Sequence, residues 1–85
     1  IIMKSYPNPF NPSTKFEVDI HESSNFNIDI FDINGKMIET ILRDEYLISG
    51  TYHFSWEPEN LSSGTYILNI SNEKYSESLK LILQK

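Results

Sequence analysis

The sequence predicts an all-β fold, an Ig-like antiparallel β-sandwich of about seven short strands. Aromatic residues make up 13% of the 85 residues and alanine is absent, which favours strands over long helices. Apolar and polar residues alternate with a period of two in successive stretches, as half-buried strands require. Turn-forming residues separate these stretches at intervals of roughly 8–14 residues, which is typical of a sandwich rather than a βαβ fold. A small barrel of the OB type is the main structural alternative.

Six stretches carry the strand pattern most clearly: 15–20, 26–33, 36–42, 50–57, 65–71 and 75–84. The residues expected to face the core are Phe16, Val18, Ile20, Phe26, Ile28, Ile30, Tyr52, Phe54, Trp56, Tyr66, Leu68, Ile70, Leu79, Leu81 and Leu83. The stretch 50–57 is the strongest candidate for a core strand, because three aromatic rings share one face and each can bury roughly 150–250 Å².

The turns between these strands follow from local residue chemistry. Asn34-Gly35 predicts a two-residue hairpin with a type I′ turn, which needs φ > 0 at both central residues. The polar stretch 43–49 is less regular and is not predicted as a strand. Gly-Thr-Tyr occurs at Gly50 and again at Gly64, and we interpret both copies as a glycine turn position that opens a strand.

The stretch from Tyr6 to Thr14 is the most constrained part of the chain. Three of the four prolines, Pro7, Pro9 and Pro12, fall within it. Each proline fixes its own φ and removes a backbone donor, so this stretch is neither a helix nor a central strand. We expect a rigid, extended and turning segment that places Tyr6 and Phe10 as two aromatic anchors.

Length and charge limit the class of protein. We expect one domain over residues 1–85, in which 1–5 is either a linker or an edge strand, and a strand before Ile1 is left open. Cysteine is absent, which excludes disulfides and thiolate metal sites. The net charge of −5 argues against nucleic acid or an anionic membrane as partner. We expect no amino-terminal signal peptide and no membrane-inserted segment.

The sequence offers no constellation for catalysis or for a metal. His21 lies in an expected turn and His53 on an expected outward face, so both are interpreted as solvated surface residues. Glu17, Asp19 and Asp29 could share one solvent face, but glycosidase chemistry by paired carboxylates needs a cleft. We therefore expect no enzyme activity, no cofactor and no metal.

Five motifs in order resemble a known family. They are Tyr6 to Thr14, Phe31 to Lys36, Ser49 to Tyr52 with Trp56, Leu61 to Tyr66, and Lys80 to Lys85. Together they are similar to the C-terminal sorting domain, type A, of the type IX (Por) secretion system of Bacteroidetes. The resemblance covers essentially Tyr6 to Lys85. Two departures fall in one loop, since Glu57-Pro58-Glu59 replaces the usual Asp-Gly and Ser62 replaces a proline.

The resemblance implies an export signal. Family members direct their parent protein, the cargo, from the periplasm across the outer membrane to the cell surface or the medium. The implied partners are the outer-membrane translocon, a sortase-like surface peptidase that removes the domain and anchors the cargo, and the amino-terminal cargo itself. The candidate recognition residues are Tyr6, Pro7, Asn8, Pro9, Phe10, Gly64, Tyr66, Lys80, Leu81 and Lys85.

A different class of function stays open at this point. The chain could be an Ig-like or fibronectin-like accessory module for adhesion, carbohydrate binding or spacing in a secreted protein. Carbohydrate binding usually needs exposed aromatic rings, whereas Tyr52, Phe54 and Trp56 are expected to face inward.

Overall fold

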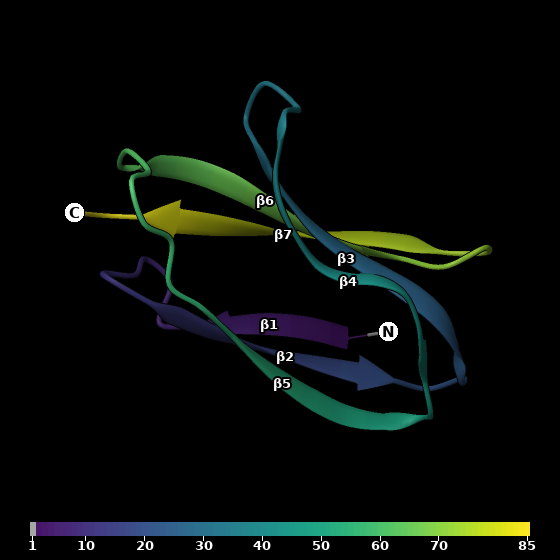
Figure 1. Cartoon of the computed structure of the whole chain (residues 1–85). Helices are drawn as coiled ribbons and strands as arrows, with labels where there is room; N and C mark the ends of the chain where they lie inside the picture. The colour runs from purple at the N-terminus through teal and green to yellow at the C-terminus, as the bar shows by residue number, and fades with distance from the viewer. Residues whose placement is uncertain (1) are drawn as a thin grey trace.

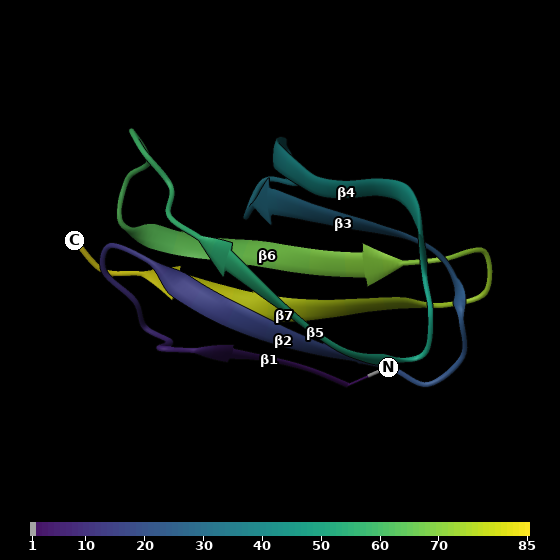
Figure 2. The ribbon, with the colours of Figure 1, turned by 60° about the horizontal axis from the view of Figure 1, so that its bottom comes forward.

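Two antiparallel sheets pack face to face in a computed structural model of the chain, which describes residues 2–85 (Figure 1). The strands are β1 (Ile2–Tyr6), β2 (Thr14–Ile20), β3 (Ser24–Asp32), β4 (Met37–Leu47), β5 (Gly50–Trp56), β6 (Gly64–Ser71) and β7 (Ser76–Leu83). One sheet has the order β1-β2-β5 and the other the order β4-β3-β6-β7. Figure 2 shows the three-stranded sheet lying against the four-stranded one. The predicted all-β sandwich is confirmed.

Strand β1 is an edge strand. Ile2–Tyr6 pairs along its whole length with β2, from Ile2 opposite Asp19 to Tyr6 opposite Lys15. Ile1, and any strand before it, lies outside the described residues. Within residues 2–85 there is no helix with the length and apolarity needed to cross a membrane.

The core forms between the inner faces of the two sheets. All of the residues expected to face inward are buried except Tyr52, Phe54 and Leu79, which are half-buried. The alternation in β2, β3 and β6 therefore predicted correctly which face of each strand is buried, because a period of two places every second side chain on the same face.

The stretch 50–57, expected to be the strongest core strand, contributes one buried aromatic ring and two half-buried ones. β5 lies at the edge of the three-stranded sheet, with β2 as its only neighbour there. Its side chains do alternate as expected, and Trp56 is 2% exposed. Tyr52 and Phe54 remain half-buried because a strand at a sheet edge is covered on one side only.

Strand β4 runs past the predicted end at residue 42 and includes most of the stretch 43–49. Its register with β3 shifts between Phe26 and Asp29, and Asp44 has a φ of 47°. The Asn27 side chain accepts a hydrogen bond from the Asp44 N–H at 2.8 Å. A bulge of this kind interrupts the alternation, which explains why the sequence pattern did not indicate a strand there.

The turn between β3 and β4 is longer than the predicted type I′ hairpin. Only Gly35 has a positive φ, 84°, and Asn34 does not. The Gly35 N–H donates to the Asp32 carbonyl at 3.1 Å, and the Asp32 N–H donates to the Lys36 carbonyl at 2.9 Å. Asp32 Oδ1 also accepts the Asn34 and Lys36 N–H groups, each at 2.9 Å. These side-chain bonds favour a three-residue loop that ends in glycine.

Candidate functional site

The proline segment 6–14 crosses from one sheet to the other. It leaves β1 and returns to β2 in the three-stranded sheet, yet its middle lies against the outer edge of β7 in the four-stranded sheet. The Phe10 N–H donates to the Ile82 carbonyl at 2.9 Å, and the Gln84 N–H donates to the Phe10 carbonyl at 2.9 Å. Phe10 thereby forms an isolated parallel bridge with Leu83. The segment covers the end of an edge strand that would otherwise expose its backbone groups.

The Asn8 side chain extends this pairing by one more step. Its Nδ2 group donates to the Lys80 carbonyl at 2.8 Å, and its Oδ1 accepts the Ile82 N–H at 2.9 Å. One amide therefore satisfies both a donor and an acceptor of β7, as a neighbouring strand would. Prolines on either side of Asn8 cannot donate backbone hydrogen bonds, so the side chain replaces them.

Three aromatic rings from different motifs meet beneath the proline segment. Phe10 packs on Trp56 with ring centroids 5.6 Å apart, and Trp56 meets Tyr66 edge-on at 5.9 Å. Trp56 Nε1 donates to Glu39 Oε1 at 3.1 Å. Such tilted and edge-to-face contacts are preferred by aromatic pairs and stabilise the fold beyond the buried area alone. This cluster joins the proline segment, β5 and β6.

Tyr66 also fixes the loop between β5 and β6. Its hydroxyl donates to the Ser62 carbonyl, four residues upstream, at 2.7 Å, which is the tyrosine corner of Ig-like sandwiches. Tyr52 in the other Gly-Thr-Tyr copy makes the same kind of bond to the Ile48 carbonyl at 2.6 Å. The repeated tripeptide thus carries one local device, and it lies at opposite ends of the two sheets.

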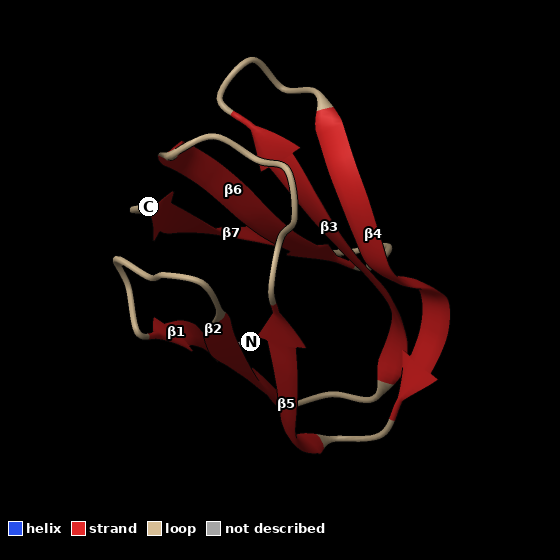
Figure 3. Cartoon of the chain, turned by 60° about the vertical axis from the view of Figure 1, so that its left-hand side comes forward, coloured by secondary structure: helices blue, strands red, loops and turns tan. Residues whose placement is uncertain are grey.

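The proline segment, the aromatic cluster and the Tyr66 loop gather at one end of the sandwich. We call it the proline end and define it as residues 6–14, the loop 57–63 and residues 80–85. Figure 3 turns this end toward the viewer and shows the proline segment, the β5–β6 loop and the chain end together. The Lys85 N–H donates to Ser63 Oγ at 2.9 Å, which ties the chain end to that loop. Asn8 is thus hydrogen-bonded at this end to residues that lie 72 and 74 positions away in the sequence.

The chain matches the family model described as the secretion system C-terminal sorting domain over residues 4–84. It belongs to this family. The comparisons with curated proteins and with solved structures gave no match.

Domains of this family are C-terminal sorting signals for type IX secretion, and that is the function of this chain. The sorting domain interacts with the type IX secretion machinery, and its parent protein is destined for the cell surface or for secretion. The alternative of an Ig-like accessory module is not favoured.

The structure divides the candidate recognition residues of the sorting domain into two groups. Phe10, Tyr66 and Leu81 are buried. The other seven candidates are exposed: Tyr6, Pro7, Asn8, Pro9, Gly64, Lys80 and Lys85. Tyr6 is 81% exposed, so of the two expected aromatic anchors Phe10 packs in the core and Tyr6 does not.

The three carboxylates that could have shared one solvent face, Glu17, Asp19 and Asp29, do not do so. Glu17 and Asp19 lie on β2, whereas Asp29 lies on β3 in the other sheet. Each has a local partner. Glu17 contacts Lys4 at 3.3 Å and His53 at 3.0 Å. Asp19 accepts the Thr51 hydroxyl at 2.7 Å, and Asp29 accepts the Thr40 hydroxyl at 2.8 Å. Alternation within each strand was correct, but it does not assign strands to sheets. Among residues 2–85 no group of three potential metal ligands occurs.

Sequence reasoning missed the role of Asn8 and of Thr14. Thr14 is 1% exposed, and its hydroxyl donates to the Pro7 carbonyl at 2.8 Å, closing the proline segment on itself. A threonine at the junction of a proline-rich turn and a strand is a weak signal for such a bond. The contact of Asn8 with β7 has no local signal at all.

Proposed function

We propose that the type IX translocon of the outer membrane recognises the exposed side chains of the proline end. The observation that carries this proposal is that the proline segment and the end of β7 form one hydrogen-bonded unit. Rigid scaffolds with accessible side chains are suited to recognition. Five exposed candidate residues on this unit have side chains free for recognition in this proposal: Tyr6, Pro7, Pro9, Lys80 and Lys85.

The buried candidates act indirectly in this proposal. Phe10, Tyr66 and Leu81 hold the proline end in shape, and Asn8 fixes the segment to β7. The same reasoning assigns Gly64 a backbone role, because it opens β6 with a φ of 158°. Residues 1–85 act as one sorting domain with no catalytic role of its own.

The export route in this proposal has three steps. The parent protein first reaches the periplasm, and the translocon then carries it across the outer membrane. A sortase-like surface peptidase finally removes the domain and anchors the cargo at the surface. Removal predicts that the exported cargo is smaller than the parent protein and no longer contains this domain.

Export of a reporter tests the recognition step. We fuse residues 1–85 to the carboxyl end of a periplasmic reporter in a host with type IX secretion, and measure the reporter in medium, surface and periplasm. The variant combines Tyr6→Ala with Lys80→Glu, both at exposed positions. We expect the wild-type fusion to leave the periplasm and the variant to lose most of its export.

A matched control separates recognition from a general loss of surface residues. Tyr46→Ala with Arg43→Glu changes an exposed tyrosine and an exposed cation on β4, away from the proline end. This control should be exported like the wild type. Circular dichroism of the purified domains confirms that each variant folds. Normal export of the Tyr6 and Lys80 variant would overturn the proposal.

A further inference from the structure

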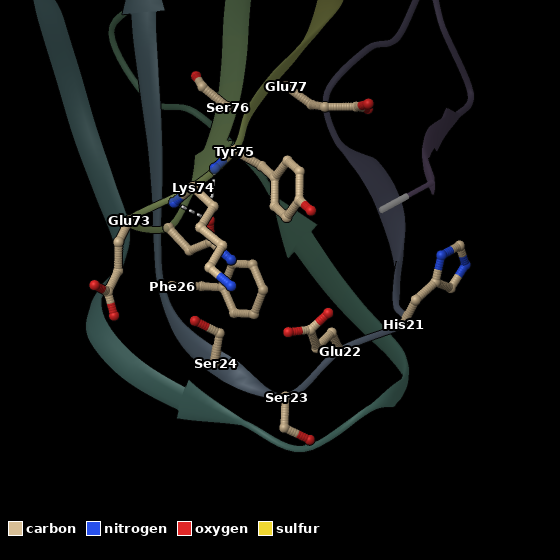
Figure 4. Close-up of a pocket in the computed structure, with 11 residues that line it drawn as sticks. His21, Glu22, Ser23, Ser24, Phe26, Glu73, Lys74, Tyr75, Ser76 and Glu77 are labelled. Atoms are coloured by element: carbon tan, nitrogen blue, oxygen red, sulfur yellow. Dashed lines mark hydrogen bonds between the residues drawn. The ribbon is translucent and has the colours of Figure 1, made fainter.

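A second surface feature lies at the end of the sandwich opposite the proline end. A cavity of about 520 Å³ opens between the β2–β3 turn and the β6–β7 turn (Figure 4). These two turns lie together, far from the proline segment, in Figures 1 and 2. The volume falls within the range of roughly 300–1,000 Å³ that is common for small-ligand sites.

The aromatic side chains of Phe26 and Tyr75 are among the residues that line this cavity. Phe26 is 1% exposed and forms its apolar floor, and Tyr75 stands at its wall with 56% of its surface exposed. Asn72 Oδ1 accepts the Lys74 N–H at 2.8 Å and the Tyr75 N–H at 2.7 Å, and the Asn72 N–H donates to the Tyr75 carbonyl at 2.9 Å. These three bonds hold the backbone of the turn at Tyr75 in place before any ligand binds.

The charges around the cavity favour a cation. Glu22, Glu73 and Glu77 line it together with Lys74, so the formal charge of the residues that line the cavity is −2. Figure 4 shows the Lys74 side chain running across Phe26 in the direction of Glu22. The chain's own lysine thus places an aliphatic stem and a cationic head in this cavity.

We propose that the cavity binds a lysine or arginine side chain from a basic segment of a partner polypeptide, which displaces Lys74. The stem of such a side chain would pack on Phe26, as amphipathic cations do on apolar surface. Its charged head would lie near the ring of Tyr75 and would be attracted by the carboxylate of Glu22. An anionic partner would be repelled by the carboxylates. This site is separate from the proline end, so its test does not depend on the proposed export function.

Titration of the folded domain with a peptide tests this site. The probe is a capped hexapeptide of alternating arginine and glycine, and the readout is the change in backbone amide chemical shifts. We expect saturable shifts confined to residues 21–26 and 72–77. A glutamate–glycine hexapeptide should give none. Shifts that do not saturate, or that map elsewhere, would overturn the proposal.

Two matched pairs of variants test the assigned side chains. Glu22→Gln should raise the Kd about two- to fivefold, the size expected for an exposed ion pair. Glu59→Gln makes the same change of charge on the β5–β6 loop and should leave the Kd unchanged. Equal weakening by both would show attraction by net charge alone and would contradict a site.

The second pair concerns the lysine that occupies the cavity. Lys74→Gln removes the competing cation and should lower the Kd, whereas Lys36→Gln in the β3–β4 loop should not do so beyond the effect of net charge. If the two variants change the Kd equally, the peptide does not displace Lys74 and the proposal fails.

Discussion

At the scale of single residues, the sorting domain uses side chains in place of backbone partners. Prolines remove donors from the segment 6–14, and Asn8 supplies a donor and an acceptor to β7 instead. Thr14 closes the same segment through the Pro7 carbonyl. Each of these contacts needs a short polar side chain at one position, which is why the segment combines prolines with asparagine and threonine.

Replacing Asn8 tests this account of the segment. Asn8→Ala removes two hydrogen bonds to β7, which should lower the free energy of unfolding by about 1–3 kcal/mol. Asn11→Ala changes an exposed asparagine in the same segment and should stay within about 0.5 kcal/mol of the wild type. Urea denaturation measures both. Equal stabilities of the two variants would show that the amide of Asn8 contributes no more than solvent does.

At the scale of elements, β7 serves the fold and the proposed signal together. Its inward side chains Leu81 and Leu83 are buried, whereas Lys80 is exposed beside the proline segment. The carboxyl-terminal half of β7 therefore contributes both to the core and to the surface of the proline end. Any change that removes this strand alters both at once.

Deletion of residues 80–85 should affect stability, whereas substitution of the exposed lysines in this stretch should not. Deleting 80–85 removes Leu81 and Leu83 from the core, and loss of one such buried leucine typically costs about 2–5 kcal/mol. The deleted domain should therefore lose its cooperative thermal transition by circular dichroism. Lys80→Gln with Lys85→Gln should keep that transition near the wild-type temperature, because both side chains are exposed. A cooperative transition in the deleted domain would contradict the assignment of β7 to the core.

At the scale of the whole molecule, local sequence patterns predicted which face of a strand is buried, but they did not predict which strands pair with each other. Alternation in β2, β3 and β6 identified the buried side chains because one face of each strand meets the core. It did not place β5 at an edge or separate Asp29 from Glu17, since the pairing of strands depends on distant parts of the chain. The bulge at Asp44 hid the second half of β4 for a local reason, the break in alternation.

The sequence identified the candidate residues of the proline end, but it did not predict that they lie together on one surface. The motifs at Tyr6 and at Lys80 were both identified, yet the contact that joins them links positions 72 residues apart. No periodicity within either motif encodes such a contact. Tyr6 and Phe10 have the same aromatic character in sequence, and only the packing of Phe10 on Trp56 distinguishes a core residue from an exposed one.

Site-specific crosslinking in cells tests the central claim most directly. A photo-reactive phenylalanine analogue replaces Tyr6 at the proline end or, in separate fusions, Tyr75 at the opposite end, both being exposed. Illumination during export should link the Tyr6 position to an outer-membrane component of the type IX machinery and leave the Tyr75 position without that product. Crosslinks to the machinery from Tyr75 and none from Tyr6 would contradict recognition through the proline end.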